Sequence, residues 1–187
     1  KTSLKFTFGS KKLVLIFLAG IFIAMMMIGK DGFQPFLIEL TMPAYGLGIL
    51  YSLTSLFSII LLLASRYFVK LTIPYIVSIA IFIAMISLCS LIFIYPPFYL
   101  LAAVVFVIEM SLQSFCMPLV KTYIHKFIPK KIRATVVSIQ SMLTQLASAI
   151  IYLVGGILMD MFGPRNVLAF GSLFGIFAII FYLKIKD

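Results

Sequence analysis

The chemistry of this sequence centres on Glu109, an acid in the middle of a long apolar run. It is the only ionisable residue near the centre of any such run, and acids within membrane spans are rare and usually functional. Removal from water disfavours the charged form of a carboxyl group, so Glu109 is suited to bind and release a proton. We expect it to be a proton or cation site; the alternative is a protonated, hydrogen-bonded structural carboxyl.

Amides and hydroxyls offer hydrogen bonds to a small molecule. Gln113 lies one helical turn beyond Glu109 on the same face. Along residues 132–159, a stripe roughly 120° wide at 100° per residue holds Ser138, Ser141, Thr144, Gln145, Ser148 and Tyr152. Residues 45–65 carry a weaker stripe of Tyr51, Ser52, Ser55 and Ser58. Close helix packing is the competing explanation of the hydroxyls, but a primary amide such as Gln145 must find a partner in hydrocarbon.

The remaining chemical groups give weaker signals. Gln34, with Asp31, Pro35 and Glu39 nearby, either rims a cavity entrance or belongs to a solvated loop. Met25, Met26 and Met27 either fill packing space, which we favour, or contact a ligand. Cys89 and Cys116 lie in apolar runs and are expected to be small buried hydrophobes. One histidine, His125, cannot build a metal site alone, so we predict neither a metal nor an organic cofactor.

The elements that position these residues must be membrane helices. Of the 187 residues, 64% are hydrophobic and only 11% are charged, and the mean hydropathy is +1.23. A soluble domain is about half apolar and a quarter charged, so lipid must cover most of this surface. The composition excludes a soluble enzyme, a nucleic-acid-binding module and a disordered tail, and predicts an integral membrane protein.

Six apolar runs are long enough to cross a bilayer, for which about 20 residues are needed. They are approximately Leu13–Gly29, Tyr45–Ser65, Leu71–Tyr95, Phe98–Val120, Ile132–Met159 and Asn166–Leu183. No alternating segments of the β-barrel type occur. We therefore predict an all-α membrane fold, with a six-helix domain over residues 13–187 that follows a basic linker over residues 1–12.

The basic residues predict the orientation of the six helices. Six crossings place both ends of the segment on one side, and of the 15 Lys and Arg residues only Lys30 and Arg165 fall on the other. By the positive-inside rule, both ends are cytoplasmic. The net charge of +10 thus needs no nucleic-acid partner, although contact with anionic membrane lipid is expected. His125, Lys126, Lys130 and Lys131 are most simply determinants of this topology, with a regulatory site as the alternative.

Two other function classes are less favoured. Intramembrane proteolysis needs a membrane-embedded histidine beside a nucleophile or metal-binding histidine pairs, and the only histidine falls in a basic loop, so we expect no enzyme. A six-helix channel or assembly subunit stays open as an alternative, but neither an Arg-rich voltage-sensing helix nor a pore-loop signal is found.

Two connecting segments resemble those of major facilitator superfamily transporters, particularly drug and metabolite exporters. The stretch Ile128–Ser138, in which Pro129 and basic residues precede Arg133-Ala134-Thr135, is similar to the loop before the family's eleventh helix. Residues 156–165, with Gly156, Asp160 and Gly163, resemble the turn that closes that helix. Gln34-Pro35, followed by Gly46 and Gly48, is similar to the passage between helices seven and eight. The family's Gly-x-x-x-Asp-Arg-x-Gly-Arg loop survives only as Ser65–Lys70, which keeps Arg66 but lacks the Gly and Asp.

The resemblance implies helices seven to twelve, arranged as two inverted three-helix repeats, of a transporter whose first six-helix half is missing. The chain, which opens on Lys1 rather than Met, is therefore expected to be part of a longer polypeptide. In such transporters the third and sixth helices of each half lie outside, which agrees with the apolar third and sixth runs here. The family implies alternating access, with a gating role for the loop residues Arg66, Arg133, Gly156, Asp160 and Gly163.

We therefore expect a secondary transporter in the cell membrane that exports amphipathic drugs or small metabolites and takes its energy from a proton gradient. The residues expected to line its cavity are Gln34, Tyr51, Ser55, Gln113, Ser141, Gln145, Ser148 and Tyr152. A mostly apolar cavity suits amphipathic substrates better than sugars or phosphates. A dedicated metabolite, siderophore or lipid transporter of the same superfamily is the alternative. We consider an anion transporter less favoured, because no Lys or Arg falls in the interior of a predicted span; Arg133 is at the very start of one that is long enough to begin outside the bilayer.

Overall fold

The computed structural model describes residues 9–26, 32–68 and 72–185. These residues form helices joined by turns, with no strand among them. The helices are α2 (Lys11–Met26), α3 (Phe33–Glu39), α4 (Ala44–Phe68), α5 (Ile73–Ser90), α6 (Tyr99–Phe127), α7 (Arg133–Phe162), α8 (Pro164–Gly171) and α9 (Phe174–Leu183), with single 3-10 turns η2 (Leu91–Phe93) and η3 (Lys130–Ile132).

The all-α membrane fold predicted from the sequence is confirmed, with five membrane-length helices among the described residues rather than six. They are α4, α5 with η2, α6, η3 with α7, and α8 with α9. The first predicted span, Leu13–Gly29, is represented by α2, whose 16 described residues fall short of a full crossing. The end of that predicted span, including Met27, lies outside the described residues.

Proline and glycine set several helix ends. Pro74 lies in the first turn of α5 and Pro164 in that of α8, where a missing N–H costs nothing because that N–H has no partner within the helix. Gly163 separates α7 from α8 with φ 78° and ψ 151°, a conformation essentially restricted to glycine. Its N–H donates to the carbonyl of Met159 at 2.8 Å, which closes α7.

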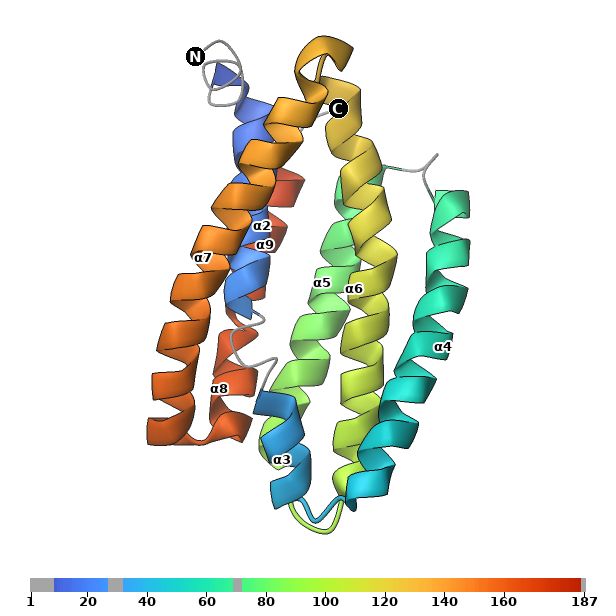
Figure 1. Cartoon of the computed structure of the whole chain (residues 1–187), viewed down its shortest axis with the longest axis vertical. Helices are drawn as coiled ribbons and strands as arrows, with labels where there is room; N and C mark the ends of the chain where they lie inside the picture. The colour runs from blue at the N-terminus through green and yellow to red at the C-terminus, as the bar shows by residue number, and fades with distance from the viewer. Residues whose placement is uncertain (1–8, 27–31, 69–71, 186–187) are drawn as a thin grey trace.

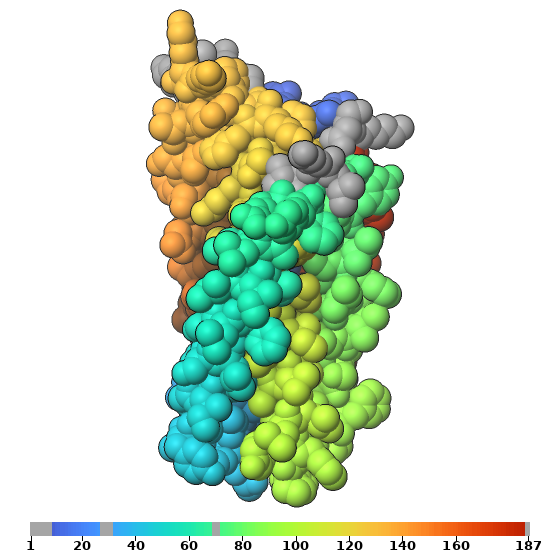
Figure 2. All heavy atoms as spheres, turned by 90° about the vertical axis from the view of Figure 1, so that its right-hand side faces the viewer, coloured from blue at the N-terminus to red at the C-terminus, as the bar shows by residue number. Residues whose placement is uncertain are grey.

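The long helices form a bundle in which α5 lies between α6 and α9 (Figure 1). α4 packs mainly on α6, and Figure 2 shows it lying across one face of the molecule with α6 and α5 beside it. α2 packs on α9 and α7. α4 and α7 are the least buried of the membrane-length helices, so this chain leaves most of their apolar surface uncovered.

Charge separates the two ends of the bundle. The start of α2, the end of α9 and the turn between α6 and α7 lie together at one end (Figure 1). Every described Lys and Arg except Arg165 belongs to this end, which we call the basic end. The exposed acids Glu39 and Asp160 belong to the opposite end. This distribution matches the one read from the sequence.

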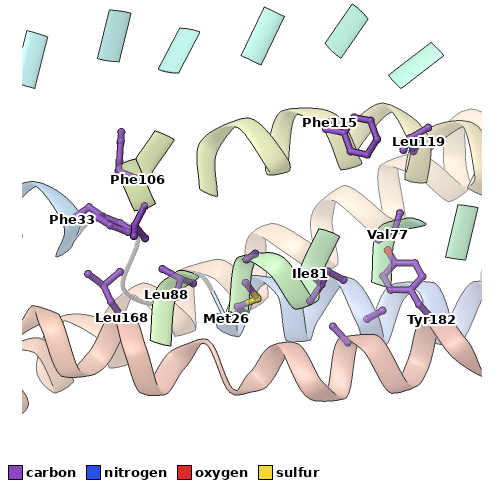
Figure 3. Close-up of a cluster of buried hydrophobic side chains, with 14 of the residues drawn as sticks. Met26, Phe33, Val77, Ile81, Leu88, Phe106, Phe115, Leu119, Leu168 and Tyr182 are labelled. Carbon is purple, nitrogen blue, oxygen red and sulfur yellow. The ribbon is translucent and has the colours of Figure 1, made fainter. Parts of the chain in front are cut away.

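Interlocking apolar side chains form the core between the helices. Figure 3 shows Met26, Val77, Ile81 and Tyr182 converging from α2, α5 and α9, and all four are buried. At the other end of the cluster, the rings of Phe33 and Phe106 meet edge to face, with centroids 5.1 Å apart. Because lipid tails are as apolar as these side chains, close packing rather than exclusion of water holds such helices together.

The structure differs from the sequence prediction in three elements. The predicted sixth span breaks between Gly171 and Phe174. There the Ser172 hydroxyl donates to the carbonyl of Ala169 at 2.6 Å, and backbone N–H groups donate to the carbonyl three residues earlier instead of four. The predicted outer loop contains a helix, α3, which buries Phe33, Phe36 and Leu37. The fourth span was predicted to end at Val120, but α6 continues to Phe127.

Candidate functional site

A pocket of about 660 Å³ opens between α2, α6 and α7. Its back wall is apolar and comes from α5, with Val77, Ala80, Ile81 and Ala84, and from Tyr182 of α9. This differs from the expectation that the third and sixth spans lie outside the cavity, because α5 belongs to the third span and Tyr182 to the sixth. The side chains of Ala80 and Ala84 are too short to fill the space between α2 and α6, so the pocket reaches α5.

Glu109 is fully buried at the wall of this pocket. Its Oε1 accepts a hydrogen bond from the Ser87 hydroxyl of α5 at 2.7 Å. Its Oε2 has no hydrogen-bond partner among the described residues. The Ser87 hydroxyl also lies 2.8 Å from the carbonyl of Ala84. A hydroxyl carries one hydrogen, so Ser87 donates either to Glu109 or to Ala84.

Five pocket residues follow each other along α6 at intervals of four. They are Glu109, Gln113, Met117, Lys121 and His125. This spacing keeps neighbours on adjacent turns of one helix side, so the row runs from the middle of the bundle to its basic end. The two predicted residues Glu109 and Gln113 thus lie in one pocket, as their spacing indicated, and the row also carries two basic groups that the sequence placed in a loop.

The α7 wall supplies most of the polar groups of the pocket. Ser141, Ser148 and Tyr152, all predicted cavity residues, line it together with Gln140 and Thr144. The Thr144 hydroxyl donates to the carbonyl of Gln140 at 2.9 Å. The pocket therefore has one polar wall on α7, a mixed wall on α6, and an apolar wall on α2 and α5.

Four predicted cavity residues lie elsewhere in the structure. Gln145 is exposed and is not among the described residues that line the pocket, because it points about 100° away from Thr144 around α7. Tyr51 and Ser55 are exposed on α4, where the ring of Tyr51 meets that of Phe106 edge to face at 5.5 Å. Gln34 is exposed on α3.

The predicted gating residues are dispersed over both ends of the bundle. At the basic end, Arg133 donates to the carbonyls of His125 at 3.1 Å and Ile128 at 3.4 Å, which fastens the start of α7 to the end of α6. Arg66 donates to the hydroxyl of its neighbour Tyr67 at 2.7 Å. At the other end, Asp160 and Gly156 are exposed and Gly163 forms the turn after α7.

Sequence reasoning missed Ser87 and Gln140 as site residues and placed Lys121 and His125 outside the spans. Gln140 had a weak signal, since it lies one helical turn before Thr144, just beside the polar stripe. Ser87 had none, because its role depends on α5 packing against α6. The described residues include no cluster of three or more side chains suited to a metal ion. Of the three predicted methionines, Met26 lines the pocket. Lys30 and Asp31 lie outside the described residues.

Comparison with models of known families matches residues 14–187 to the family described as Major Facilitator Superfamily. The matched range includes every residue that lines the pocket. No curated protein matches the chain.

Proposed function

The chain belongs to the major facilitator superfamily, and we propose that it forms the second half of a secondary transporter that couples inward proton flow to export of amphipathic small molecules. The family consists of transporters rather than enzymes, and the chain is a multi-pass integral membrane protein with an all-α, half-transporter fold. The proton coupling, the direction and the substrate class are our proposal.

One observation carries this proposal: a fully buried carboxyl group with a free oxygen atom lies at the wall of an otherwise largely apolar pocket. Glu109 has a single hydrogen-bond donor, Ser87, and no described cation beside it. Burial with one donor favours the neutral, protonated carboxyl. Release of the proton then requires a change in the surroundings of Glu109, which is the behaviour that a proton-coupling site needs.

The pocket walls support an amphipathic substrate. The α2 and α5 walls are built from aliphatic residues and Gly20, whereas α7 offers hydroxyl and amide groups. A pocket of about 660 Å³ has the size of known small-molecule sites, most of which are apolar with a few polar anchors. Sugars would need more polar groups than these walls hold.

We further propose that the basic end is cytoplasmic and that a second six-helix half covers the uncovered faces of α4 and α7. Short basic loops stay on the cytoplasmic side during insertion. Several residues that line the pocket are exposed in this chain, among them Lys121, Ser141 and Tyr152. A preceding half of the same polypeptide would cover them. Transport then proceeds by rocking of the two halves around the pocket, without an organic cofactor or metal.

The test uses the intact polypeptide in lipid vesicles, with a fluorescent amphipath offered in cationic, neutral and anionic forms. We expect an imposed proton gradient to drive accumulation of at least one form. Glu109→Gln should abolish the gradient-driven part and keep exchange at equal pH, because glutamine mimics the protonated acid but cannot release a proton. Glu39→Gln, which changes an exposed acid on α3, is the matched control and should behave as the original protein.

Gradient-driven transport that survives in Glu109→Gln would refute the role of Glu109 and place the coupling group elsewhere in the polypeptide. If none of the three forms of the amphipath is transported, the proposed substrate class is wrong, and a specific metabolite or a lipid becomes the candidate substrate.

A further inference from the structure

The pocket ends at two basic side chains that the proposed function does not use. Lys121 and His125 lie one turn apart on α6, at the basic end, and both line the pocket. We propose that this end of the pocket binds the anionic group of an amphipathic ligand, a carboxylate, sulfonate or phosphate, whose apolar part extends along α2 and α5. The proposal deepens the proposed function, because it gives the charge of the substrate.

The positive charge of Lys121 is not cancelled within the described structure. At a rise of 1.5 Å per residue, Lys121 lies about 18 Å along α6 from Glu109. Glu39 and Asp160, the other described acids, belong to the opposite end of the bundle. An anion that enters the pocket at this level therefore meets a cation without a competing carboxylate.

His125 adds a hydrogen-bonding group that lacks a partner. Its Nδ1 is buried and has no hydrogen bond among the described residues. Its backbone is held in place, because its carbonyl accepts a hydrogen bond from Arg133. Buried polar atoms are nearly always paired in folded proteins, so an unpaired nitrogen at the wall of a pocket indicates a ligand group that satisfies it.

The opposite wall offers polar groups at the same level. Lys121 lies six residues before the end of α6 and Gln140 seven residues after the start of α7, which places both about 10 Å from the turn that joins the two helices. Gln140 and Ser141 both line the pocket. A tetrahedral or planar anionic group can thus receive hydrogen bonds from α7 while it faces Lys121 and His125 of α6.

The rest of the pocket determines that the ligand is an amphipath rather than an inorganic ion. The walls on α2 and α5 are lined by Ile16, Ile23, Val77 and Ala80, which offer nothing to a hydrated ion. The ligand can be a dissolved solute or the headgroup end of an anionic membrane lipid, because both combine an apolar chain with a negative group.

Lys126 is an internal control for this proposal. It follows His125 directly, carries the same charge as Lys121 at the same end of α6, and is exposed as Lys121 is. Lys126 differs in that it lies over the ring of Tyr123 at 5.9 Å and is not among the described residues that line the pocket. A general attraction of anions to the basic end involves both lysines equally, whereas a site in the pocket involves Lys121 alone.

The experiment measures binding of a dansyl-labelled undecanoic acid, and of its uncharged primary amide, to the intact polypeptide in phosphatidylcholine nanodiscs. We expect the acid to bind about tenfold more tightly than the amide, which corresponds to a difference in binding free energy of about 1.4 kcal/mol. Lys121→Gln should remove most of this difference, His125→Phe should reduce it, and Lys126→Gln should leave it unchanged. Monodisperse elution of each variant controls for folding.

Equal affinities for the acid and the amide would overturn the proposal, and so would equal losses in Lys121→Gln and Lys126→Gln. If vesicles that contain the protein accumulate the acid, the ligand is a transported solute. If they do not, and phosphatidylglycerol displaces the acid, the site holds a lipid headgroup; either result supports an anion site. Charge-selective binding without proton-driven transport refutes only the proposed function, and proton-driven transport without charge-selective binding refutes only this inference.

Discussion

The hydrogen bond between Ser87 and Glu109 gives the sharpest quantitative prediction, because its two partners are not equivalent. Without Ser87, Glu109 has no hydrogen-bond partner among the described residues, whereas without Glu109, Ser87 still has the carbonyl of Ala84 as an acceptor. Ser87→Ala leaves both carboxyl oxygens of Glu109 unpaired among the described residues. A buried polar atom without a partner costs about 1–3 kcal/mol, so we expect Ser87→Ala to destabilise the protein by that amount. Glu109→Met has a smaller effect, because the Ser87 hydroxyl keeps the Ala84 carbonyl at 2.8 Å as its acceptor.

The double variant Ser87→Ala with Glu109→Met should be about as stable as Glu109→Met alone, since no polar group is then left unpaired. The two single changes are therefore not additive, and a double-mutant cycle should give a coupling energy of about 1–3 kcal/mol. Ser90→Ala is the matched control: Ser90 lies one turn further along α5, and its hydroxyl donates only to the carbonyl of Ser87.

Thermal unfolding of the purified protein in detergent measures these differences, at about 2–4 °C per kcal/mol for a domain of this size. Ser87→Ala should melt several degrees below the original protein and below Ser90→Ala. Additive effects of the two single changes, or a larger loss in Glu109→Met than in Ser87→Ala, would refute the reasoning. Either result would mean that Glu109 has another partner, such as water or a group outside the described residues.

Two further predictions concern α7 and the pocket wall. Gly163→Ala should destabilise the protein by about 1–3 kcal/mol, because φ 78° with ψ 151° is strained for alanine. Gly156→Ala is the control: Gly156 is an exposed helical residue with open space where a Cβ would be added, so this change should be neutral or stabilising. Equal melting temperatures of the two variants would contradict the prediction. In a Cys89→Ser background, a membrane-permeant maleimide should label Cys116, which lines the pocket. A bound amphipath should slow this labelling at least several-fold. If no transported compound slows the labelling, the ligand binds elsewhere.

Much of the fold could be predicted from the length of the apolar runs, because each helix in a bilayer must satisfy its own backbone. The predictions were wrong where local hydrogen bonding overrides composition. Hydropathy ends a span at its first charge, so the fourth was predicted to end before Lys121, whereas the helix continues to Phe127. Ser172 belongs to an apolar run and still interrupts a helix, because its hydroxyl competes for a backbone carbonyl.

The candidate site could be predicted only in part. Periodicity assigns residues to one face of one helix, and Glu109 with Gln113, and Ser141 with Ser148 and Tyr152, do share a pocket. Periodicity does not tell which neighbouring helix that face meets. The predicted cavity residues therefore included Gln145, which does not line the pocket, and omitted Gln140, which does. The contact between Ser87 and Glu109 joins residues 22 positions apart on different helices, and only the packing of α5 on α6 brings them together.

The positions of Glu109 and Lys121 on α6 also constrain how the proposed coupling of proton and substrate would operate. Across about 18 Å at an effective dielectric constant near 20, a charge on Glu109 and one bound near Lys121 interact by only about 1 kcal/mol. Reversal of a two-state equilibrium from 1:99 to 99:1 takes about 5.5 kcal/mol, so direct electrostatic interaction is too weak. Coupling must therefore involve movement of the helices. Pro118 lies inside α6 between the two groups, where it removes a backbone hydrogen bond and allows a bend. A bend there would change the depth of Glu109 and the position of Lys121 together, which links the two sites without contact between their ligands.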